Sequence, residues 1–97
     1  MKLNVPLKYK KDIELATNLL KDEGCKSVFL FGSLVTGKIH ENSDIDIGIR
    51  GLAKGRFFSV YAHLDRVLIN RFDLVDFDLH KGFYILLDSL DEVIELG

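Results

Sequence analysis

Hydrophobic and polar residues follow two rhythms along the chain, and each rhythm predicts one type of element. Apolar residues that return every three to four positions predict helices over about residues 8–23, 56–69 and 79–90. Asp44 to Arg50 alternates strictly, which predicts a strand whose isoleucines face the core. Short apolar segments predict strands over residues 27–31 and 72–77. Residues 93–96 are expected to form a short edge strand, with an extension of the last helix as the alternative.

Each predicted helix is expected to bury one face against a sheet. The expected core residues are Tyr9, Ile13, Ala16 and Leu20 in the first helix, Phe57, Tyr61, Leu64 and Leu68 in the second, and Phe83, Leu86, Leu87 and Leu90 in the third. Gly24 is expected to end the first helix, and residues 33–43 to form a turn, a short helical segment and a loop. This order predicts an α/β two-layer sandwich, a small mixed sheet covered by helices, as a single domain over residues 1–97.

The composition narrows the classes of function. With 13 basic and 15 acidic residues spread along the chain, the net charge of -2 argues against general nucleic-acid binding, which needs a basic face. No window approaches 18 consecutive apolar residues and the N-terminal segment is too polar for a signal peptide, so we expect no membrane partner and a cytoplasmic protein. Cys25 is the only cysteine and is expected to be structural.

Candidate chemistry begins with Asp44 and Asp46, two positions apart on the predicted strand. Their side chains share one face, with Cβ atoms roughly 6 to 7 Å apart. Carboxylates so placed repel each other and raise each other's proton affinity, and a divalent cation removes that conflict. Carboxylate oxygen is the donor that Mg2+ prefers. The alternative interpretation is that the two aspartates form the solvated face of a half-exposed strand.

Gly32 and Ser33 end the strand predicted over residues 27–31, and ten residues, 34–43, separate them from Asp44. A glycine at that point lets backbone N–H groups approach an anion, and the serine adds a hydroxyl donor. A Gly-Ser pair alone is usually just a turn. Together with the paired aspartates, it predicts a metal-dependent site for a nucleoside triphosphate.

The segment FGSLVTGKIHENSDIDIGI resembles the signature of the nucleotidyltransferase superfamily related to DNA polymerase beta, which is Gly-Ser, about ten residues, then Asp-x-Asp. Its form and the chain length are most similar to the minimal nucleotidyltransferase (MNT) branch. The resemblance implies a nucleotidyltransferase fold in which Gly32 and Ser33 hold the triphosphate. It also implies that Asp44 and Asp46 are catalytic and bind the metals.

The resemblance implies a third carboxylate, and three aspartates of the segment FDLVDFD compete for that role. Asp73 lies on one face of the predicted strand, and Asp76 and Asp78 lie on the other, so periodicity alone does not choose among them. The family pattern resembles an apolar residue followed by Asp-Leu-Val, which selects Asp73 as catalytic and metal-binding. Asp78 is expected to be the N-cap of the last helix.

The chain departs from the family pattern where positive charge is expected. Many minimal members carry a basic residue directly after Gly-Ser and another just before the next glycine, and here those positions are Leu34 and Thr36. Lys38, directly after Gly37, is expected to compensate, and both residues join the expected nucleotide-binding set. The residues expected to be ordinary surface charges are Arg50, Lys54 and Arg56.

The resemblance implies an enzyme that transfers a nucleoside monophosphate, AMP from ATP, to a hydroxyl acceptor with the help of two Mg2+ ions. It also implies a small helical partner of the HEPN type, as in toxin–antitoxin pairs in which the nucleotidyltransferase modifies its partner. The alternative is a non-catalytic antitoxin or scaffold subunit with the same fold. Leu34 and Thr36 favour this alternative, whereas the complete carboxylate set opposes it.

Overall fold

A computed structural model describes residues 5–39 and 43–97, so part of the predicted 33–43 loop lies outside the described residues. The elements follow the predicted order and are α1 (Leu7–Asp22), β1 (Ser27–Phe31), α2 (Ser33–Thr36), β2 (Ile45–Arg50), α3 (Phe57–Val67), β3 (Phe72–Asp76), α4 (Lys81–Ser89) and β4 (Val93–Glu95). Gly24 follows α1 with a φ of 102°, as expected for a helix-ending glycine. Within the described residues, no helix is both long and apolar enough to cross a membrane.

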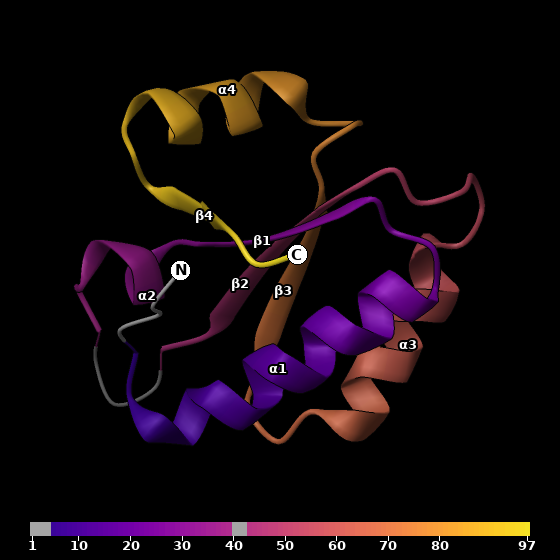
Figure 1. Ribbon diagram of the computed structural model, residues 1–97, viewed down its shortest axis with the longest axis horizontal. Coiled ribbons are helices and arrows are strands. Elements are labelled where there is room, and N and C mark those ends of the chain that lie inside the picture. The colour runs from indigo at the N-terminus through magenta and orange to yellow at the C-terminus, as the bar shows by residue number, and fades with distance from the viewer. Residues whose placement is uncertain (1–4, 40–42) are drawn as a thin grey trace.

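The four strands form one mixed sheet in the order β3-β2-β1-β4. β1 pairs antiparallel with β2 and with β4, whereas β2 and β3 are parallel. In Figure 1, α1 and α3 lie side by side on one side of the sheet and α4 lies on the opposite side. The predicted α/β fold, a small mixed sheet covered by helices, is confirmed.

The main core lies between the sheet and the pair α1 and α3. The strict alternation in β2 produces the predicted result, because Ile45, Ile47 and Ile49 are at most 1% exposed. α1 contributes its predicted face, and Val60 and Leu64 are the fully buried residues of α3. Tyr61, predicted for this core, is 37% exposed and faces a pocket beside β3 instead.

A smaller core lies on the other face of the sheet, beneath α4. Phe29 and Phe31 of β1 pack there against Phe77 and Leu87. The ring of Phe77 lies so close to Gly48 that a Cβ at that position would stand 2.1 Å from it. The absence of a side chain at Gly48 therefore allows this aromatic cluster to close over β2.

The prediction for the buried face of α4 is partly wrong. Leu87 is buried and Tyr84 is half-buried, whereas Phe83, Leu86 and Leu90 are between 41% and 54% exposed. The helix has nine residues and contributes one fully buried side chain, so it buries a narrower stripe than the apolar pattern predicts.

The N-cap prediction for Asp78 is wrong. α4 begins at Lys81 after His80, which makes no capping side-chain hydrogen bond. Asp78 instead accepts hydrogen bonds from the Gly51 N–H, at 2.7 Å, and from Arg50 Nε, at 3.4 Å. The Gly51 hydrogen bond is the main reason why the pKa of Asp78 lies below its ordinary value. The carboxylate therefore ties the end of β2 to the segment after β3.

Candidate functional site

Three carboxylates meet where the parallel strands β2 and β3 begin. Asp46 of β2 is in register with Asp73 of β3, so the two side chains stand beside each other on one face of the sheet. Asp44 precedes β2 by one residue and lies on the same face, two positions before Asp46. Asp76 is in register with Ile49 on the core side of the sheet. The register thus brings Asp73, and not Asp76, to the aspartates of the Asp-x-Asp motif.

Asp46 is the electrostatic centre of this group. Its pKa is raised from 3.8 to about 6, chiefly by burial and then by the negative charges of Asp73 and Asp44 and a hydrogen bond with Asp73. Each cause penalises the ionised form. Without a cation, the site therefore holds negative charge at a cost in stability, as the sequence predicts for paired carboxylates.

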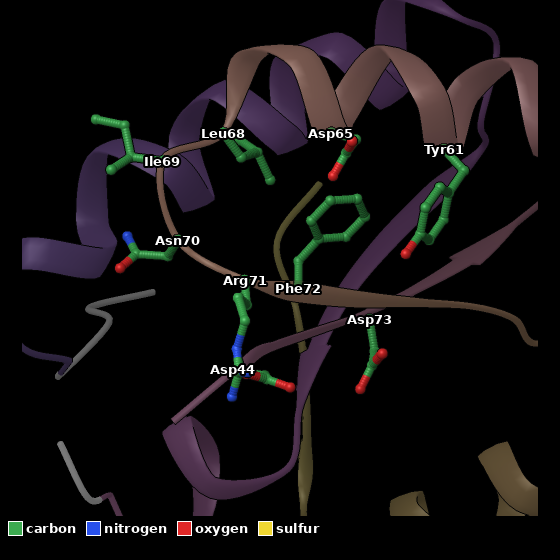
Figure 2. Close-up of a pocket in the computed structure, with 9 residues that line it drawn as sticks. All are labelled: Asp44, Tyr61, Asp65, Leu68, Ile69, Asn70, Arg71, Phe72 and Asp73. Carbon is green, nitrogen blue, oxygen red and sulfur yellow. Dashed lines mark hydrogen bonds and ion pairs between the residues drawn. The ribbon is translucent and has the colours of Figure 1, made fainter. Parts of the chain in front are cut away.

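Asp44 has a positively charged neighbour. Its Oδ1 lies 3.1 Å from Nε of Arg71, and Figure 2 shows the two side chains pointing toward each other. The parallel register places Arg71 opposite Asp44, and the Ile45 N–H donates to the Arg71 carbonyl at 2.9 Å. The contact follows from the pairing of β2 with β3, but the motif does not indicate it.

The turn at Gly32 and Ser33 packs directly beneath Asp46. Gly32 has φ 77° and ψ -152°, a conformation open essentially to glycine alone. A Cβ on Gly32 would stand 2.0 Å from Asp46 Oδ2. Glycine is therefore required twice, for the backbone conformation and for the room that the carboxylate occupies. Gly37 ends α2 in the left-handed conformation.

Leu34 cannot face a ligand at this turn, because it is 3% exposed and packs in the main core. The position that is basic in many minimal members is here a core anchor for α2. Thr36 is exposed. The side chain of the first departing position therefore stabilises the turn without contributing to phosphate binding.

Two pockets flank the carboxylates. The β3 pocket, about 550 Å³, is lined by Asp44 and Asp73, by Tyr61 and Asp65 of α3, and by residues 68–72 (Figure 2). The β1 pocket, about 710 Å³, lies where β1 ends beside the start of β4, and Gly32 in its lining borders Asp46. The lining of the β1 pocket is Gly32, Ser33, Val35, Thr36, Lys38, Asp91 and Glu92.

The donor chemistry of the carboxylates fits Mg2+, because hard carboxylate oxygens gather where a cation would relieve the repulsion around Asp46. The arrangement is incomplete, since no three His, Cys, Asp or Glu side chains within the described residues converge as a metal ion requires. Asp46 and Asp73 stand together, while Asp44 is held by Arg71. The three aspartates expected to bind metal therefore lie in one neighbourhood, with Oδ1 of Asp44 paired to Arg71.

Several residues near the carboxylates were not predicted from the sequence. Arg71, Tyr61 and Asp65 line the β3 pocket, and Asp91 and Glu92 line the β1 pocket. A signal for Arg71 exists, because a parallel pairing of Asp46 with Asp73 also sets Asp44 opposite Arg71. Asp91 and Glu92 precede β4, so predicting their place in the β1 pocket requires knowing that β4 pairs with β1.

The other candidate cations are engaged away from the carboxylates, as expected for surface charges. Arg50 pairs with Asp78, and Arg56 Nη2 lies 2.6 Å from Glu23 Oε1. Lys54 is exposed in the loop after β2. Cys25 is buried, and burial raises its pKa to about 11, which keeps the thiol protonated and supports a structural role.

Two crystal structures of toxin–antitoxin proteins resemble this chain. One, a toxin–antitoxin structure with AMP-PNP, has 26% identity and a TM-score of 0.65, and the match covers 91% of this chain and 72% of that one. The other, a mutant of the toxin–antitoxin MntA-HpeT, has 28% identity and a TM-score of 0.51, with coverage of 67% and 56%. No curated protein sequence matches the chain.

The sequence profile of the family described as "Polymerase beta, Nucleotidyltransferase" matches residues 10–91. This range contains the Gly32 turn, the three carboxylates and every strand except β4. The structural neighbours agree with the minimal form of the family that the Gly-Ser and Asp-x-Asp motifs indicate. The chain belongs to the polymerase beta-type nucleotidyltransferases.

Proposed function

We propose that the chain is a Mg2+-dependent nucleotidyltransferase that moves AMP from ATP to a hydroxyl group of a partner protein. The observation that carries the proposal is that Asp46 and Asp73 are in register on adjacent strands, with Gly32 packed directly against Asp46. This arrangement brings a phosphate-binding turn and carboxylates to one point, as a nucleotidyl transfer requires. Family membership supports the reaction class, and a neighbour that contains AMP-PNP supports an adenine nucleotide.

The proposed role of each residue is based on its position in the site. Gly32 and Ser33 hold the triphosphate, with Gly37 shaping the turn and Lys38 adding positive charge at the pocket's edge. The carboxylates Asp44, Asp46 and Asp73 would hold two Mg2+ ions, which would supply Lewis-acid chemistry to the transfer.

Asp73 is the proposed general base for the acceptor hydroxyl. In an in-line displacement, the attacking oxygen and the leaving pyrophosphate lie on opposite sides of the transferred phosphorus. The Gly32 turn lies on the β1 side of Asp46, and Asp73 lies on its β3 side. The acceptor therefore enters through the β3 pocket, where Asp73 is exposed and can take the proton.

A partner protein supplies the acceptor in this proposal. The β3 pocket is open and lies at the edge strand of a small sheet, so a second chain can reach Asp73. The two neighbours are toxin–antitoxin structures, which supports a partner of the toxin type, and we propose a small helical HEPN-like protein. The protein would then work as a cytoplasmic antitoxin.

The test incubates the protein and its co-purifying partner with Mg2+ and ATP labelled at either the α- or the γ-phosphate. We expect α-label on the partner and no γ-label, because nucleotidyl transfer releases pyrophosphate. Asp44→Asn and Asp46→Asn should each lower the rate at least about 100-fold, whereas Asp88→Asn on exposed α4 should keep it. Transfer of γ-label, or equal rates in all four proteins, would refute the proposal.

A second candidate is a non-catalytic antitoxin that uses the same fold to bind its partner. Two observations favour it. Arg71 neutralises the charge of Asp44, and the buried Leu34 occupies a position that is basic in many minimal members, so it adds no positive charge for the phosphates. The two candidates differ in one result. If the partner is neutralised equally by Asp46→Asn and no label moves, binding alone is the function.

A further inference from the structure

Arg71 is fixed at the carboxylates by its backbone. Its carbonyl accepts the Ile45 N–H at 2.9 Å, which joins the beginnings of β2 and β3. The loop before it is held by buried Asp12, whose Oδ2 accepts the N–H groups of Ile69 and Asn70 at 3.0 and 2.7 Å. The backbone of Arg71 is therefore held in place, while its long, exposed side chain is free to move the guanidinium from one partner to another.

Positive charge is scarce in the two pockets beside the carboxylates. Lys38 lines the β1 pocket, but Asp91 and Glu92 line the same pocket and offset its charge. Leu34 replaces a basic residue and is buried. Among the described residues that line the two flanking pockets, the cations are Lys38 and Arg71. Of these, Arg71 is the one that contacts a carboxylate of the site.

We propose that Arg71 is a nucleotide-binding residue that exchanges partners. Before metal binds, its guanidinium neutralises Asp44, with Nε and Oδ1 at 3.1 Å. When a divalent cation takes Asp44, Arg71 is released and binds an oxygen of the α-phosphate, the transferred group that lies between the Gly32 turn and the β3 pocket. The inference rests on the proposed function for the identity of the ligand, and it accounts for the absence of a converged metal site among the described residues.

The chemistry of arginine suits both partners. A guanidinium binds carboxylates and phosphates through paired N–H groups, and it stays charged in either contact. The Arg71 side chain is 78% exposed, so its ion pair with Asp44 is weakened by water and readily exchanged. A divalent cation alone has to displace Arg71 and is repelled by it. A nucleotide that arrives with the metal gives Arg71 a new partner, so metal and nucleotide favour each other's binding.

The experiment measures two affinities in Arg71→Gln. Binding of Mn2+ alone is followed by electron paramagnetic resonance, and binding of the Mg2+ complex of AMP-PNP by calorimetry. We expect opposite shifts, because Arg71 competes with the metal but assists the nucleotide. Mn2+ should bind about three- to tenfold more tightly, and the metal–nucleotide complex about tenfold more weakly.

Two further variants make the result specific. Arg71→Lys keeps the charge but lacks the paired N–H groups, so both affinities should lie between those of the parent and of Arg71→Gln. Arg66→Gln removes an exposed arginine of α3 outside the β3 pocket lining and should change neither. Affinities that fall together or stay unchanged in Arg71→Gln would overturn the inference. The proposed function fails on a different result, an unlabelled partner with the parent protein.

Discussion

Asp12 is buried and Asp46 is half-buried, and the surroundings of the two carboxylates are opposite. Asp12 is 1% exposed, and its Oδ2 accepts two backbone N–H groups and the Asn70 side-chain amide. Asp46 stands beside two other carboxylates, and its pKa is raised to about 6. Three N–H donors stabilise Oδ2 of Asp12, while its buried Oδ1 has no hydrogen-bond partner among the described residues. Asp46 is instead surrounded by negative charges that repel it.

The difference separates a structural carboxylate from a functional one. Asp12 joins α1 to the loop before β3, so its hydrogen bonds contribute to folding. Asp46 lowers stability until a cation arrives, and such unrelieved repulsion in an accessible site is typical of ligand-binding residues. The same side chain thus serves two purposes, which its neighbours determine.

Asp12→Ala should produce the largest loss of stability, because it removes the carboxylate that joins α1 to the loop before β3. It leaves the N–H groups of Ile69 and Asn70 without their acceptor, so the free energy of unfolding should fall by about 3 kcal/mol. Urea titration measures the change. Glu14→Ala, on the exposed face of the same helix, should alter stability by less than about 0.5 kcal/mol. Equal effects would contradict the structural role of Asp12.

Gly32→Ala should cause the next largest loss of stability, and it also tests the role of Asp46. A Cβ there strains the backbone and displaces Asp46, so we expect a loss of about 2 to 3 kcal/mol together with loss of transfer. Gly37→Ala has the same positive φ but nothing within 4 Å of its Cβ, so it should lose only about 1 kcal/mol. Circular dichroism melts compare the two. A smaller loss at Gly32 than at Gly37 would show that the close contact is unimportant.

Asp46→Asn should have a smaller effect of the opposite sign. The amide removes the charge that burial and two carboxylates oppose, so the protein without ligand should gain about 1 kcal/mol at pH 7.5, after allowance for the half-exposed position. Calorimetric melting measures the gain. A destabilised Asp46→Asn would mean that the carboxylate has a structural role like that of Asp12.

The pH dependence tests the same contrast more finely. The folded-state pKa of Asp46, about 6, exceeds its ordinary value of 3.8, so the folded protein binds this proton more tightly. The resulting stabilisation is fully present below about pH 4 and is lost as the pH rises through about 6. Relative to Asp46→Asn, the parent should therefore lose stability between pH 4.5 and 7, by about 1 kcal/mol. Parallel stability curves would place the pKa of Asp46 near its ordinary value.

The sequence predicts local patterns well and long-range placement poorly. Alternation in β2 and the apolar stripe of α1 are local, and the structure confirms both. The choice of Asp73 over Asp76 required a family pattern, because only the parallel register of β3 with β2 distinguishes them physically. Asp78 looks like a helix cap by position, but Gly51, 27 residues away, determines its contact.

The most direct measurement compares the melting temperatures of the parent and Asp46→Asn at pH 7.5, first without ligand and then with Mn2+ and AMP-PNP. If Asp46 is held in an unfavourable environment to bind metal and nucleotide, Asp46→Asn melts higher without ligand, by about 4 to 8 °C. The parent then becomes the more stable protein when both ligands saturate it. If the order of the two proteins is the same in both conditions, the central claim about Asp46 is wrong.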